Sequence, residues 1–206
     1  MSWLKQQHRA LWQFYREELG ETLLITTAAF VIICLLTFAA GIFNRDLPEL
    51  VVDYFQQLLE SNDILTDEGG IDLLALFGNN LRACGVSILY GFIPFLYLTA
   101  LALGTNALIL GVFAAFFVNN DTSLLVYFAG ITPHGVFELS ALLLAFSGGF
   151  LLCRRVTQYV RKNTKGVMKP LMLNLLRVFV MHILPLLVIA AVMEVYVTPR
   201  VMALFM

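Results

Sequence analysis

Hydrophobic residues are gathered along this chain into five long runs that polar segments separate. A helix needs about 20 predominantly apolar residues to cross a bilayer, and the runs have roughly that length. We predict membrane-crossing helices over Thr22–Phe43, Leu81–Gly104, Thr105–Val118, Ser123–Leu152 and Leu171–Val197. The third run is short for a span, and the fourth is long, with a break predicted near Pro133. Pro185 predicts a kink in the fifth.

Two segments outside these runs have apolar residues at helical spacing. Trp3–Leu19 lies within an N-terminal segment, 1–21, for which we expect a cytoplasmic amphipathic helix. Asp46–Leu59 opens with an acid before a helical pattern, which predicts a second amphipathic helix outside the cell. Both fit helices that lie in the membrane interface, and both equally fit ordinary helices that dock on the bundle.

Composition places the chain among integral membrane proteins. Of its 206 residues, 60% are hydrophobic and only 13% are charged, and the mean hydropathy is +0.84. A soluble domain has about a quarter of its residues charged, so this chain has too little polar surface for a water-soluble fold. We predict one all-α membrane domain over residues 1–206, and the few basic residues give no support for nucleic-acid binding.

The charged residues predict the orientation. The segment 153–170 has six basic residues and no acid, and Lys5, Arg9 and Arg16 lie near the N-terminus. The segment 44–79 has eight acids against Arg45 alone. Lys and Arg are enriched on the cytoplasmic side of membranes. We therefore expect the N-terminus and the basic segment in the cytoplasm, and the acidic segment and the C-terminus outside.

The fourth run contains polar residues where a membrane helix tolerates few. Thr132 and Pro133 resemble an N-cap followed by proline at the first helical position. If the helix restarts there within the membrane, the break lies near the bilayer midplane, buried in protein or lining a wet cavity. If Pro133–Leu152 spans alone, His134 lies at the outer mouth instead. The pattern leaves both geometries open.

His134 and Glu138 are the central candidates for chemistry. At helical spacing they share one face with Ala141, Ala145 and Gly149, and small residues in such a ladder let helices approach closely. We expect this face to turn toward protein. An ionised carboxylate at a helix centre costs about 3 kcal/mol on insertion scales. Glu138 therefore either binds a structural partner or handles ions or protons.

Other polar positions have two interpretations each. Arg82 can extend toward the outer interface or act as counter-charge to Glu138, and Asn106 can cap a helix or bond across the bundle. His182 is a candidate partner for Glu138 from another helix, or a core histidine with its own hydrogen bond. His134 and Glu138 alone do not make a metal site. No catalytic or cofactor motif is present, so we expect neither an enzyme nor a cofactor.

At these residues the sequence resembles the stage II sporulation protein M family. The resemblance rests on P-H-G-x-x-E-L at Pro133–Leu139 and on N-N-L-R at Asn79–Arg82, followed by Gly85, Gly91 and Asn106. It covers about residues 78–152 in the family's order. The family often has Asn-Gly where this chain has Asn106-Ala107.

The resemblance implies a prokaryotic inner-membrane protein and a shared site. Its residues would be Pro133, His134, Gly135 and Glu138, with Asn80, Arg82 and Asn106 as neighbours. One hypothesis is a small transporter or channel-like protein that handles ions or protons at His134 and Glu138. The other is a non-catalytic scaffold or subunit of a cell-envelope complex. Expected partners are membrane lipid, a second copy in a homodimer and cell-envelope proteins.

Overall fold

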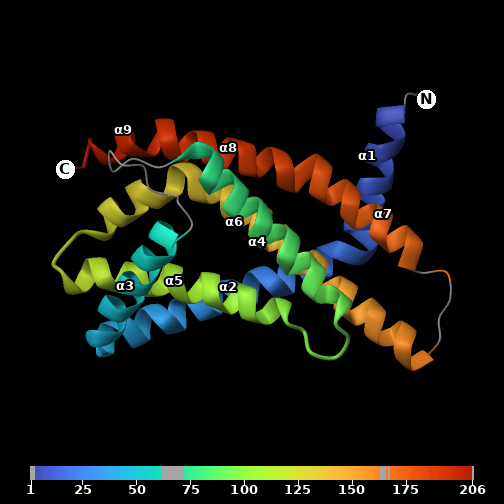
Figure 1. Ribbon diagram of the computed structural model, residues 1–206, viewed down its shortest axis with the longest axis horizontal. Coiled ribbons are helices and arrows are strands. Elements are labelled where there is room, and N and C mark those ends of the chain that lie inside the picture. The colour runs from blue at the N-terminus through green and yellow to red at the C-terminus, as the bar shows by residue number, and fades with distance from the viewer. Residues whose placement is uncertain (1–2, 62–71, 163–165, 167, 206) are drawn as a thin grey trace.

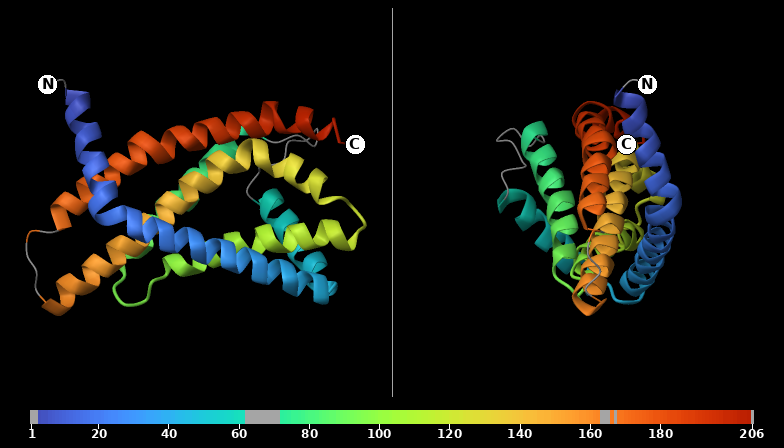
Figure 2. Two further views of the ribbon diagram at one scale, coloured as in Figure 1. Left: turned by 180° about the vertical axis from the view of Figure 1, so that it is seen from behind. Right: turned by 90° about the vertical axis from the view of Figure 1, so that its right-hand side faces the viewer.

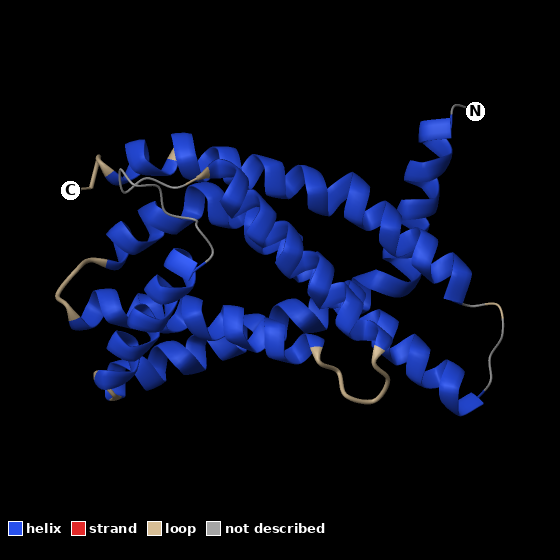
Figure 3. Cartoon of the chain, in the orientation of Figure 1, coloured by secondary structure: helices blue, strands red, loops and turns tan. Residues whose placement is uncertain are grey.

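The computed structural model describes residues 3–61, 72–162, 166 and 168–205, and in these every regular element is helical, with no strand (Figure 3). Residues 62–71 of the acidic segment, and 163–165 and 167 of the basic one, lie outside the described residues. The helices are α1 (Trp3–Phe14), α2 (Gly20–Phe43), α3 (Asp46–Ser61), α4 (Leu73–Leu89), α5 (Thr99–Asn119), α6 (Leu124–Lys162), α7 (Met168–Val178), α8 (Leu184–Tyr196) and α9 (Thr198–Met202). Short helical turns of other types join some of them.

Five stretches of helix are long and apolar enough to cross a membrane, which confirms the predicted fold class. They are Lys5–Phe43, Leu73–Phe92, Thr99–Asn119, Leu124–Lys162 and Met168–Tyr196. The first and last each contain a π turn, a wider helical turn with i→i+5 hydrogen bonds. The first π turn, Tyr15–Leu19, joins α1 to α2, and the second, Phe179–Ile183, joins α7 to α8 just before Pro185.

The second and third spans differ in their bounds from the sequence prediction. The second begins at Leu73, where the Asp72 side chain caps the helix by accepting a 2.7 Å hydrogen bond from Ala75 N. The third runs over Thr99–Asn119 and is 21 residues long, so it is not short. Between the two spans, residues 93–98 turn the chain at positive φ of Phe95 and Tyr97. This turn is as apolar as the spans, so hydropathy could not mark it.

The predicted break near Pro133 is a bend in the structure. α6 continues through Pro133 over 39 residues without interruption. Figures 1 and 2 show α6 changing direction where its colour passes from yellow to gold. Proline has no N–H, and its ring crowds the carbonyl four residues earlier. A helix that contains proline therefore bends, and the neighbouring helices support this bend without an interruption.

The spans alternate between the two ends of an elongated molecule. α1, the end of α6 and the start of α7 lie at one end of the long axis, while α3 and α9 lie at the other (Figure 1). The described parts of the basic and the acidic segments therefore lie at opposite ends, as the charge pattern predicts. Which end faces the cytoplasm stays a prediction.

Small residues bring α4, α5 and α6 into close contact. Ala141 and Ala145 are fully buried, which confirms that this face of α6 turns toward protein. A Cβ on Gly149 would lie 2.3 Å from Ser87 O. Thr99 Oγ1 donates a 2.9 Å hydrogen bond to the same carbonyl. Here a glycine is needed because backbone occupies the space that a side chain would take.

The α2–α5 pair is equally close. A Cβ on Gly111 would lie 2.3 Å from Cys34 O, and Asn119 Nδ2 donates a 2.9 Å hydrogen bond to Gly41 O near the other end of the pair. Figure 1 shows α2 and α5 running along one another, with α4 and α6 crossing them diagonally. The bundle thus contains two tightly joined helix pairs.

Both amphipathic helices dock on the bundle. Leu11 and Phe14 of α1 are buried, and Gln7 of α1 accepts a 2.6 Å hydrogen bond from Arg177 of α7. On α3, the ring of Phe55 packs edge-to-face on Phe113 of α5, with centroids 5.2 Å apart. Both helices therefore contact the bundle, and their position in the membrane interface stays a prediction.

Candidate functional site

A polar cavity of about 350 Å³ lies between α3, α4, α5, α6 and α8. Five of the seven predicted site residues line it, namely His134, Gly135, Glu138, Asn80 and Asn106. They come from three spans, so the fold brings together residues that the sequence keeps up to 58 positions apart (138 − 80). Much of the remaining lining is apolar, including Phe55 and Phe113.

His134 contacts two residues near the C-terminal end of the bundle, Glu194 and Thr198, which the sequence motif does not include. Its Nδ1 forms an ion pair with Oε2 of Glu194 on α8, and both side chains are 17% exposed. The same nitrogen lies 3.2 Å from Oγ1 of Thr198 on α9. A proton on Nδ1 therefore joins the imidazole to the carboxylate, and the orientation of the ring is fixed from one side.

Glu138 lies one helical turn from His134 and is partly buried. Its carboxylate is close enough to interact electrostatically with His134 and with Glu194, and the side chain of Asn80 donates toward it. Asn80 itself is only 8% exposed. Two acids and one imidazole thus share one space inside the bundle.

Asn79 and Asn106 add polar groups to the wall. Asn106 donates its amide to Ala102 O at 2.8 Å, one turn back in its own helix. This bond uses an N–H, so the carbonyl oxygen of the side chain is not consumed by it. Together the lining provides carboxylate, imidazole and amide groups on a mostly apolar background. Such a set can pass a proton, or replace part of the hydration of a small cation.

Two predicted site residues lie outside this lining. Pro133 shapes α6 next to His134 but does not line the cavity, and Arg82 is exposed on α4. Arg82 does not line the cavity that contains Glu138, and its extension toward the outer interface stays a prediction. His182 lies elsewhere: its Nδ1 is 2.7 Å from the hydroxyl of Tyr15, so it is a core histidine with its own partner.

Glu194 was missed as a site residue by the sequence interpretation. It lies two residues before the end of α8, where an acid is easily taken as part of the interface. An available signal was its position within the last apolar run, Leu171–Val197, where acids are rare. Only the tertiary fold, which lays α8 along α6, places it beside His134 (Figure 2).

Within the described residues, no group of three or more His, Cys, Asp or Glu side chains is placed to hold a metal ion. The three described cysteines, Cys34, Cys84 and Cys153, are free thiols.

Comparison with known proteins extends the sequence match. The family model described as stage II sporulation protein M matches residues 22–199, from the first span to the end of the bundle. An uncharacterized protein of Methanocaldococcus jannaschii is 33% identical over 128 residues, which are 62% of this chain and 71% of that protein. No solved structure matches the chain.

Proposed function

The chain belongs to the stage II sporulation protein M family, and we propose that it is a small transporter or channel-like protein that moves protons or small cations through the polar cavity. The observation that carries this proposal is the convergence of His134, Glu138 and Glu194 inside the helical bundle. Ionisable residues within membrane spans are rare and mark ion pathways and proton relays.

The arrangement suits transfer of positive charge in steps. His134 interacts with both acids: its imidazole contacts the Glu194 carboxylate and attracts the Glu138 carboxylate electrostatically. A proton or cation that enters at one acid can pass to the other by way of the imidazole. The amides of Asn80 and Asn106 line the same space and offer polar contacts along it.

The cavity also lies at a suitable place along the bundle. Glu194 is near the end of α8, and Phe55 belongs to α3, so this end of the cavity lies toward the acidic segment. Asn106 is at the eighth position of α5, closer to the opposite end. The polar lining therefore reaches from the acidic end into the middle of the bundle. An acidic surface raises the local concentration of cations at its entrance.

The test is flux into proteoliposomes, measured for protons and for a panel of monovalent and divalent cations. Glu138→Gln keeps the size of the side chain and removes its charge, so flux should be abolished while the helical content and melting temperature stay close to wild type. Glu49→Gln is the matched control, because Glu49 is an exposed acid on α3 outside the cavity. It should leave the flux unchanged.

Two outcomes contradict the proposal. Normal flux in folded Glu138→Gln protein would remove the assigned role of this carboxylate. No flux in wild type, together with a large fall in the melting temperature of Glu138→Gln, would make the acid a structural partner of His134 and Asn80.

A further inference from the structure

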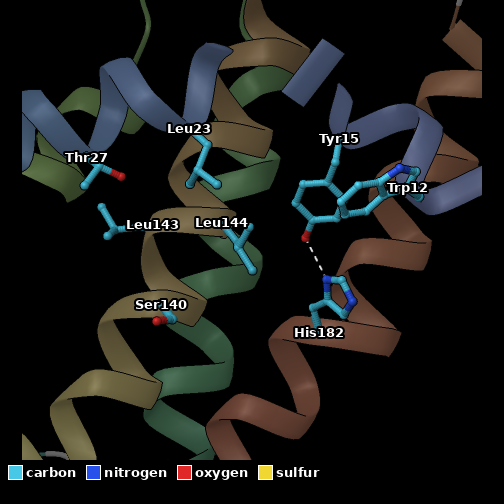
Figure 4. A pocket seen from close by; sticks show the side chains of 8 residues that line it. All are labelled: Trp12, Tyr15, Leu23, Thr27, Ser140, Leu143, Leu144 and His182. Atoms are coloured by element: carbon cyan, nitrogen blue, oxygen red, sulfur yellow. Dashed lines mark hydrogen bonds between the residues drawn. The ribbon is translucent and has the colours of Figure 1, made fainter. Parts of the chain in front are cut away.

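A second cavity, of about 510 Å³, lies on another face of α6. Its lining comes from the first span and from α6 and the second π turn (Figure 4). The first part consists of Trp12 of α1, Tyr15 of the first π turn, and Leu23 and Thr27 of α2. The second part consists of Ser140, Leu143 and Leu144 of α6, and His182 of the second π turn. This cavity shares no lining residue with the polar cavity. Its volume falls within the ~300–1,000 Å³ of small-molecule sites.

The cavity wall contains a hydrogen-bonded pair of polar side chains, Tyr15 and His182, in addition to the hydroxyls of Thr27 and Ser140. The hydroxyl of Tyr15 lies 2.7 Å from Nδ1 of His182, and the two rings are 5.4 Å apart. A phenol has one proton and two lone pairs. Whichever partner donates in this bond, the Tyr15 oxygen keeps the capacity for one more hydrogen bond.

Both members of this pair lie in π turns. Tyr15 begins the first π turn and His182 lies in the second. π turns are rare, and they occur frequently at functional sites because they displace a side chain from its regular helical position. Here two of them, 167 residues apart, place their side chains in hydrogen-bonding contact. This coincidence indicates a built site.

Most of the remaining lining is apolar and comes from helices that are long and apolar enough to cross a membrane. In Figure 4, Leu23 of α2 and Leu144 of α6 both lie beside the Tyr15–His182 pair. Leu23 belongs to the first span and His182 to the middle of the last. Ser140 donates its hydroxyl to Val136 O and is thereby satisfied within α6. Trp12 at the rim is 68% exposed, and tryptophan is enriched at membrane interfaces.

We propose that this cavity binds one membrane glycerolipid. An acyl chain would lie between α2 and α6 against Leu23, Leu143 and Leu144. The uncharged ester region would hydrogen-bond to the Tyr15 hydroxyl, and the headgroup would emerge past Trp12. An uncharged ester fits this wall because none of the side chains that line the cavity is Lys, Arg, Asp or Glu. The wall therefore complements a neutral hydrogen-bonding group and has no Lys or Arg to pair with a phosphate.

The site is independent of ion movement. The proposal concerns residues that the polar cavity does not use, so it holds or fails whatever the flux measurements show. A lipid in this position would bridge α1, α2 and α6, and would cover apolar side chains that the helices leave uncovered.

The experiment uses the full chain in vesicles of phosphatidylethanolamine and phosphatidylglycerol that include a phosphatidylglycerol with a photoreactive acyl chain. After irradiation, crosslinked peptides are mapped by mass spectrometry. Crosslinks should concentrate on the α2 segment around Leu23 and on the α6 segment around Leu144. Leu144→Trp, which fills the cavity, should lose them. Leu125→Trp is the matched control, because Leu125 is 67% exposed on the same helix and the added ring reaches no cavity; its crosslinks should persist.

Tyr15→Phe keeps the volume of the ring and removes the hydroxyl. It should lower the amount of lipid retained through detergent purification about fivefold, as expected for one lost hydrogen bond. This variant tests the proposal even if Leu144→Trp does not fold. Crosslinks spread evenly over the exposed faces of the spans, and unchanged in both Leu144→Trp and Tyr15→Phe, would overturn the proposal.

Discussion

Gly149 is the position where the smallest substitution should have the largest effect on stability. A methyl group there would lie 2.3 Å from Ser87 O and 2.6 Å from Thr99 Oγ1. The carbonyl belongs to backbone, so the helices must separate, which costs about 1–3 kcal/mol as overpacking. Thr99 would also lose its 2.9 Å hydrogen bond to Ser87, worth about 1 kcal/mol. Alanine regains about 1 kcal/mol through helix propensity.

The free energy of unfolding of Gly149→Ala should therefore fall by about 1–3 kcal/mol. For a chain of this size, 1 kcal/mol shifts the melting temperature by ~2–4 °C, so a loss of roughly 2–12 °C is expected in detergent. The matched control is Gly104→Ala in α5, where an added Cβ meets nothing within 4 Å; it should melt at or slightly above the wild-type temperature. Equal melting temperatures for the two variants would refute the steric argument.

Two further substitution experiments test other parts of the structure. Asp72→Ala removes the side chain that caps Ala75 N and should lower the free energy of unfolding by ~1 kcal/mol, seen as a drop of ~2–4 °C in melting temperature. Asp72→Ser should restore most of this loss. An unchanged melting temperature in Asp72→Ala would show that α4 begins without this cap. In a chain whose native cysteines are replaced, a membrane-impermeant thiol reagent should label the exposed positions Asp53→Cys from outside intact cells and Arg161→Cys only after permeabilisation. The reverse pattern would invert the predicted orientation.

The sequence was informative where hydropathy and spacing act locally. The number of spans follows from the length of the apolar runs, and the burial of Ala141 and Ala145 follows from their helical spacing with His134. The convergence of Asn80, Asn106 and Glu138 was reached through motifs that resemble the family, because no local rule links three helices. The helices themselves were therefore easier to predict than their contacts.

The structure differs from the sequence predictions where contacts between distant residues determine the conformation. Residues 93–98 form a turn although they are apolar, and α6 passes through Pro133 because its neighbours support the bend. Glu194 meets His134 only through the way α8 lies on α6. The π turn that holds Tyr15 leaves no signature in hydropathy. Each depends on contacts between residues far apart in the chain.

The glycine contacts also divide the molecule mechanically. α2 and α5 are joined through Gly111, and α4 and α6 through Gly149, each against backbone that cannot yield without separating the pair. The polar cavity has Asn106 on the first pair, and Asn80 and Glu138 on the second. Thr99 of α5 also contacts Gly149 and hydrogen-bonds to Ser87, so α5 links the two pairs at this point. We expect the pairs to rotate relative to one another about this link, so that a small change in the angle between them changes the width of the polar cavity at Glu138.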